Sequence, residues 1–311
     1  PLLSYLNPLL QDDALEVSRN AIRSCGKLQN RDALPQLVSR IADSRVRHDV
    51  RQALIQYGDL IVGTLVEYLH DPKVSLPVRA NIPKVLSEMN SQEAVNALVR
   101  SLPRLDPFLG HRAIKALSKM RVRFPRLSFA DEAIDSAILG ELRDYYEFGI
   151  MLQSEEMKHS ENRAVLRLLR QALQERMDQK LEHVFRLLGL RYPPTDIYSA
   201  YSGLRSQQNH VRASAIEFLA NLLLPNMKQL LFPILEESAA DVLLAHGNRH
   251  FGLQQKSRNA YLEQCMTGRD LWLQTIWIYV AGDLGLAELA PAVRLASASE
   301  NPMLSQTAQR S

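Results

Sequence analysis

Two histidines four residues apart, His246 and His250, have the spacing with which one face of a helix can hold a metal ion. Between them stand Gly247 and Asn248, which predict a loop over residues 247–252 instead of a helix. No third ligand follows nearby, and the sequence contains no H-E-x-x-H, P-loop or G-x-G-x-x-G motif. We therefore interpret both residues as surface or capping histidines and expect no metal and no cofactor.

Adjacent carboxylates could supply a general acid and a general base if they faced a common cleft. They occur at Asp12-Asp13, Glu155-Glu156 and Glu236-Glu237. All three pairs fall at expected helix ends or in polar stretches, where capping and solvation explain them. No arrangement of a nucleophile with a base is readable either, so the sequence predicts a chain without enzymatic activity.

Positive charge is concentrated between residues 100 and 126, a stretch that holds eight basic side chains and one acid, Asp106. The segment that follows, up to Glu161, is strongly acidic. Because the opposite charge lies so close in the sequence, internal pairing with that segment is the favoured interpretation. The alternative hypothesis is contact with lipid phosphates or an acidic partner. Its candidate residues, several of which step by three and four along one helix, are Arg112, Lys115, Lys119 and Arg123.

The helices expected to position these residues are encoded by a sequence pattern that recurs along the chain. In each copy an Asp or Asp-Pro precedes an arginine flanked by Val, Ala, Leu or Ile, and the first four arginines are 32, 28 and 33 residues apart: Arg19, Arg51, Arg79 and Arg112. The Asp is expected to cap a helix, and the apolar residues to point inward. The arginine is expected to reach the capping Asp of its own or the adjoining repeat. Each helix pair leaves an apolar face open, so it must stack on the next pair.

The repeat divides the chain into three parts. Residues 1–125 hold the first repeats, including an expected helix over 74–89, and residues 193–311 hold later ones, ending in a truncated repeat. Between them, 126–192 contains two long apolar stripes, which predict helices over 129–152 and 163–189 in an antiparallel hairpin. A further helix is expected over 254–265. The predicted fold is therefore all-α: a solenoid of helix pairs interrupted by a long hairpin.

Composition limits the classes of function. The chain has 311 residues with a net charge of only +3, whereas a dedicated nucleic-acid binder is expected to carry a strongly basic stripe. Two distant cysteines, Cys25 and Cys265, give no disulfide framework and suit a reducing compartment. The first residue is Pro1 and the last lies within an apparent new helix, so we expect a segment of a longer protein.

The repeat resembles the HEAT family, over residues 1–125 and again over 193–236. Residues 129–236 also resemble one particular group of that family, through His183-Val-Phe-Arg-Leu-Leu-Gly-Leu-Arg-Tyr-Pro-Pro-Thr-Asp196 and Arg212-Ala-Ser-Ala-Ile-Glu-Phe-Leu219. In these bacterial proteins HEAT repeats follow a major-facilitator domain of the ATP/ADP-translocase type, and a cyclic-nucleotide-binding domain often follows the repeats. The resemblance implies a non-catalytic coupling module at the cytoplasmic face of a membrane, with those two domains as partners.

Two other functions use similar repeats. HEAT-like DNA glycosylases bind duplex DNA on a basic concave face, which would require a basic lining across several repeats and a pocket with an aromatic residue and a carboxylate. In this chain the basic excess is confined to residues 100–126. A chaperone-like lyase for a bilin pigment is the third candidate, but no residue pattern supports it. Binding of nucleic acid is therefore not expected.

Overall fold

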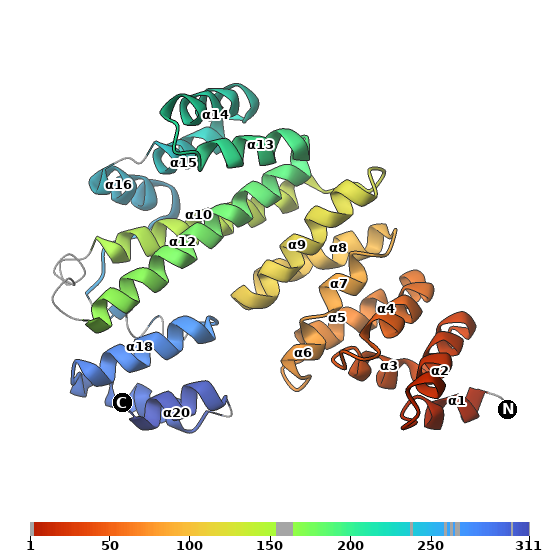
Figure 1. Ribbon diagram of the computed structural model, residues 1–311. Helices are drawn as coiled ribbons and strands as arrows, with labels where there is room; N and C mark the ends of the chain where they lie inside the picture. The colour runs from red at the N-terminus through yellow and green to blue at the C-terminus, as the bar shows by residue number, and fades with distance from the viewer. Residues whose placement is uncertain are drawn as a thin grey trace. The chain divides into compact units, whose positions relative to one another are not determined.

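The computed structural model of the chain consists of helices joined by turns and loops (Figure 1). It describes residues 3–153, 164–236, 239–257, 260–261, 264, 268–299 and 301–310. Within these ranges there is no β-strand, which confirms the all-α prediction. No helix in the same ranges combines the length and the apolar content needed to cross a membrane.

The chain divides into two compact units. Unit 1 consists of Pro1–Ala137 and Gly189–Pro194, and unit 2 consists of Ile138–Leu188 and Thr195–Ser311. The division into 1–125, 126–192 and 193–311 stays a prediction.

Unit 1 is a series of helix pairs in which each helix packs on its neighbours in sequence. Its helices are α1 (Leu3–Leu9), α2 (Leu15–Leu28), α3 (Leu34–Arg40), α4 (Arg47–Gln56), α5 (Val62–His70), α6 (Leu76–Arg79), α7 (Ile82–Leu86), α8 (Gln92–Ser101) and α9 (Pro107–Arg123). The partners are α1 with α2, α3 with α4, α5 with α7, and α8 with α9. The second helices also touch in order, α2 on α4, α4 on α7 and α7 on α9.

The small and apolar residues of the repeat point inward as predicted. Val50, Ala53 and Leu54 of α4 are buried, as are Ala113 and Ile114 of α9. The first copy departs from this pattern, because Val17 is exposed. Ser18 is buried in its place, and its hydroxyl donates to the Leu10 carbonyl at 2.8 Å.

The repeat arginines join neighbouring helix pairs, although each does so differently. Arg51 forms an ion pair with Glu88 at 3.0 Å, and Arg79 lies 4.0 Å from Asp106, the N-cap of α9. The predicted contact between an arginine and the adjoining capping Asp is thus confirmed for Arg79. Arg112 donates instead to the carbonyl of Ala80, at 3.2 Å.

The other repeat aspartates form turns before their helices, not helix caps as predicted. The side chains of Asp12, Asp43 and Asp71 each accept from the backbone N–H two residues later, at 2.8, 3.0 and 2.9 Å. This is an Asx turn, in which a short carboxylate folds the chain back before the helix begins. The prediction that these three cap their helices directly is therefore wrong, whereas Asp106 does so, accepting from Leu109 N–H at 3.0 Å.

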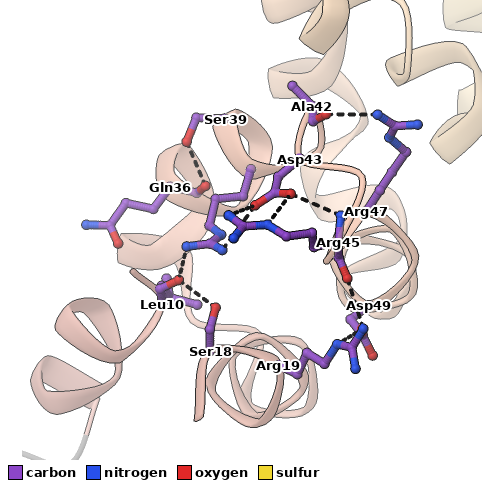
Figure 2. A network of polar contacts seen from close by, with 11 residues as sticks. Leu10, Ser18, Arg19, Gln36, Ser39, Ala42, Asp43, Arg45, Arg47 and Asp49 are labelled. Carbon is purple, nitrogen blue, oxygen red and sulfur yellow. Dashed lines mark hydrogen bonds and ion pairs between the residues drawn. The ribbon is translucent and has the colours of Figure 1, made fainter. Parts of the chain in front are cut away.

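A polar network joins the first two helix pairs (Figure 2). At its centre the Asp43 carboxylate accepts two hydrogen bonds from the Arg45 guanidinium, at 3.1 and 2.9 Å. The hydrogen bonds from the Arg45 side chain and backbone lower the pKa of Asp43 to about 2. Arg19 of the preceding pair donates to the Arg45 carbonyl at 3.1 Å. Arg47 closes the other side by donating to the Ala42 carbonyl at 2.8 Å, so arginine side chains satisfy backbone carbonyls of the turn between α3 and α4.

The helix expected over 74–89 is two short helices, which corrects the prediction. α6 ends at Arg79 and α7 begins at Ile82. Pro83 stands in the first turn of α7, and proline has no N–H with which to bond the carbonyl four residues back. A continuous helix would leave the Arg79 carbonyl without that partner, so the chain starts a new helix instead.

Both long helices expected from the sequence are present, α10 (Asp131–Leu152) and α12 (Ala164–Arg191). Residues 154–163, which make up most of the polar stretch between the two helices, lie outside the described residues. Ion pairs fix the direction of the two helices. Asp135 pairs with Arg191, Glu141 lies 3.0 Å from His183, and Asp144 lies 2.6 Å from Lys180. As the α10 number rises the α12 number falls, so the helices are antiparallel.

The remaining helices of unit 2 follow in the order α13 (Pro194–Leu204), α14 (Asn209–Leu222), α15 (Pro225–Leu235), α16 (Ala240–Phe251), α18 (Leu271–Asp283), α19 (Ala290–Ser297) and α20 (Pro302–Arg310). Tyr146 of α10 donates to the carbonyl of Leu230 in α15, at 2.8 Å. Arg176 of α12 forms a two-point contact with Asp270, which caps α18. Residues 254–257 are not helical, whereas residues 260, 261 and 264 are. The other residues of the helix expected over 254–265, including Cys265, lie outside the described residues.

Candidate interaction surface

Helix α9 positions the four candidate contact residues. Its start is well defined, because Asp106 caps the first turn and Pro107 occupies a first-turn position where no N–H is needed. One side of α9 is apolar, and Leu109, Ala113 and Leu117 are buried there against the preceding helices. The polar side must then face away from the core.

All four candidate residues lie on that outer side. Arg112, Lys115, Lys119 and Arg123 are exposed. At 100° per residue they fall within an arc of roughly 80° on the helix surface. The structure therefore brings the four residues together on one face of one helix, and α9 itself contains no acidic residue.

Two of the four residues are arginines, and the guanidinium groups of both lie over aromatic rings. The Arg112 guanidinium carbon is 4.8 Å from the centre of the Phe108 ring, and that of Arg123 is 5.3 Å from the centre of Phe124. A cation over a ring face keeps its charge and loses conformational freedom. Both contacts hold the positive charges at the surface of α9.

The four residues have no ion pair with a carboxylate anywhere in the described part of unit 1. Arg100 of the same stretch differs, since it pairs with Glu93 at 2.6 Å. The pairing with the acidic segment that the sequence favoured is not seen within unit 1. Glu155, Glu156 and Glu161 of that segment lie outside the described residues.

Positive charge continues from α9 onto α7. Lys84 is exposed, and its pKa is lowered first by the charge of Arg51 and then by burial. Lys119 of α9 and Arg47 of α4 add to this effect. The Glu88 carboxylate opposes it but is already held by Arg51. The lowered lysine pKa indicates a positive local potential that comes chiefly from Arg51 and to which Lys119 of α9 contributes.

Four acidic side chains of α10 have partners on α12. In unit 1 Arg191 binds Asp131 at 3.3 Å and also Asp135. In unit 2 the buried Lys180 ammonium lies 3.1 Å from Glu141 and 2.6 Å from Asp144. These pairs bind the long helices together and account for much of the acidic charge that the sequence placed after residue 126.

Lys180 and His183 form a buried ionic cluster that sequence reasoning missed. The two basic residues, three apart on α12, face Glu141 and Asp144, three apart on α10. Burial acts to raise the pKa of Glu141, but the His183 hydrogen bond and the Lys180 charge outweigh it, and the pKa is lowered. The sequence did contain a signal for this cluster. Two acidic residues three apart on one expected helix match two basic residues three apart on the antiparallel one.

The histidine pair lies on a helix, which corrects the predicted loop over 247–252. α16 continues to Phe251 and ends at Gly252, whose positive φ of 65° suits a helix C-cap. Gly247 lies within α16, and its lack of a side chain permits close packing, because an added Cβ would lie 3.0 Å from the Ile150 side chain. The rings of His246 and His250 are 5.7 Å apart. Among the described residues no group of three or more His, Cys, Asp or Glu is placed to hold a metal ion.

Comparisons with known proteins add no family to this description. No protein-family model matches the chain, and the search of curated proteins gives no match.

Proposed function

We propose that the chain is a non-catalytic interaction module in which HEAT-like helix pairs form an α-solenoid. Support for the solenoid comes from unit 1, where the second helices contact one another in order and Arg19, Arg51 and Arg79 join successive pairs. Such stacks offer long surfaces for other proteins and bend slightly at each joint. A module of this kind suits coupling between domains.

The observation that carries the proposal is the outer face of α9. Four exposed cations stand on one helix, without a carboxylate partner in the part of unit 1 that the structure describes. Charges used for internal stability are normally paired, as Arg51 is with Glu88. The α9 face is therefore proposed as a contact site for an anionic partner.

The setting of the module follows from the resemblance over residues 129–236. In the proposed full-length protein, a major-facilitator domain of the nucleotide-transporter type and a cyclic-nucleotide-binding domain are its partners. The module would lie at the cytoplasmic face of the membrane and transmit the state of one domain to the other.

Retention on immobilised heparin, a polyanion, tests the contact site. We expect the variant R112Q/K115Q/K119Q/R123Q to elute at clearly lower salt than the unaltered chain. The matched control R23Q/K27Q/K73Q/R100Q removes the same charge from exposed positions outside α9. It is expected to elute close to the unaltered chain, because Arg23 and Arg100 already pair with Asp49 and Glu93. Equal shifts for the two variants would show that net charge alone governs binding and would overturn the proposed site.

A further inference from the structure

Two apolar side chains flank the cations on the outer face of α9. Phe108 is 47% exposed and Val122 is 63% exposed, although both are large hydrophobic residues. Together with the cations between them they form a row with steps of four, three, four and three residues: Phe108, Arg112, Lys115, Lys119 and Val122. With a rise of 1.5 Å per residue, the row is about 21 Å long. We call these five residues the α9 stripe.

The chemistry of the α9 stripe points to one class of partner. We infer that the stripe binds the surface of a lipid bilayer with anionic headgroups. This inference rests on the proposed function, since it names the anionic partner of the same site. Cations attract acidic headgroups, while apolar side chains can enter the boundary between headgroups and acyl chains. A bilayer surface meets both requirements along one straight helix.

Other anionic partners match only part of the stripe. A nucleic-acid backbone would neutralise the cations but leave Val122 in water, because phosphates and sugars offer it little apolar cover. Phe108 is also held under the Arg112 guanidinium, whose carbon lies 4.8 Å from the ring centre. This contact covers a ring face on which a base would otherwise stack. An acidic peptide remains an outcome of the test below.

The neighbouring positive field strengthens the attraction. Lys84 of α7 is exposed, and Lys119 contributes to the positive potential around it. An anionic bilayer acts on every cation within roughly 10 Å of its surface at moderate salt, so charges beside the stripe add to those within it.

Co-sedimentation with vesicles tests the inference at moderate salt. One set of vesicles is pure phosphatidylcholine and the other contains phosphatidylserine. The unaltered chain is expected to sediment only with the second set. The apolar variant F108Q/V122Q is expected to bind those vesicles about tenfold more weakly, because it loses both groups that enter the boundary. It should still be retained on heparin like the unaltered chain.

A matched apolar control separates the stripe from general surface hydrophobicity. Leu28 and Leu60 are 59% and 57% exposed in unit 1 and lie outside α9. The variant L28Q/L60Q is expected to bind vesicles like the unaltered chain, and circular dichroism would confirm that all variants remain helical. Vesicle binding unaffected by F108Q/V122Q would overturn the inference.

The outcomes distinguish the two proposals. Retention on heparin that depends on the four cations, together with no binding to phosphatidylserine vesicles, would overturn the bilayer as partner and leave the proposed contact site standing. In that case an acidic protein becomes the partner to seek. If R112Q/K115Q/K119Q/R123Q were retained on heparin as strongly as the unaltered chain, that result would overturn the contact site itself.

Discussion

Gly26 of α2 and Ala53 of α4 pack so closely that a Cβ atom added to Gly26 would lie 2.7 Å from the Cα atom of Ala53. The second helices of the first two pairs thus touch through their backbones. Ala53 belongs to the repeat, and its small side chain permits this approach. The contact sets how tightly the first helix pair stacks on the second.

Replacing Gly26 with Ala should therefore destabilise the chain. The added methyl group meets backbone that cannot move freely, and overpacking of this kind costs about 1–3 kcal/mol of unfolding free energy. Urea denaturation followed by circular dichroism measures the change. The control Gly63→Ala adds the same methyl group where no atom lies within 4 Å, and it should leave the stability unchanged or slightly raised. Equal stability of the two variants would contradict the proposed stacking contact.

The joint between the first two pairs should respond to acid through Asp43. Its folded-state pKa of about 2 lies below the ordinary value of about 4. Ionised Asp43 therefore stabilises the fold at pH values above 4, and this contribution is lost as the pH falls through 2. The unfolding free energies of the unaltered chain and of Asp43→Asn should differ clearly at neutral pH and converge as the pH falls towards 2.

The Arg45→Gln variant isolates the cause of this shift. The hydrogen bond from the Arg45 side chain is the largest influence on the Asp43 pKa, so its removal should raise that pKa towards the ordinary value. A carboxyl-carbon NMR titration follows Asp43 directly. An unchanged midpoint in Arg45→Gln would show that the network in Figure 2 does not control the carboxylate.

For the buried cluster around Lys180 we predict a large loss of stability when its central cation is removed. Lys180→Met leaves Glu141 and Asp144 without their common cation, and breaking a buried pair in this way costs about 3 kcal/mol. Arg186→Gln on the same helix breaks a pair with Glu182 that is more exposed, and it should change stability by less than about 1 kcal/mol. Chemical denaturation of both variants checks the ranking. A larger loss for Arg186→Gln would contradict the assignment of Lys180 as the buried centre.

Much of the local fold could be predicted from the sequence because repeated residues report the same environment several times. Val50, Ala53 and Leu54 were expected inside, and the two long helices were expected from their apolar stripes. The predictions failed where a single residue acts against the local pattern. Pro83 divides an expected helix, and Gly247 extends one by packing closely where its composition indicated a loop.

The candidate surface was harder to predict than the core. The sequence identified the four cations but not their neighbours, because exposure of Phe108 and Val122 depends on which face of α9 packs inward. The partners of the acidic helix were missed for a similar reason. Lys180 and Asp144 are 36 residues apart, and only the pairing of α10 with α12 brings them together.

Lysine acetylation followed by mass spectrometry tests the central claim, that the outer face of α9 contacts an anionic partner, without altering the chain. The reagent modifies exposed lysines, and Lys115 and Lys119 of α9 can be compared with Lys27 and Lys73, which are also exposed, elsewhere in unit 1. With heparin or phosphatidylserine vesicles added, acetylation of Lys115 and Lys119 should slow severalfold, while Lys27 and Lys73 react as before. Equal protection of all four lysines, or protection of Lys27 and Lys73 alone, would contradict the proposed surface.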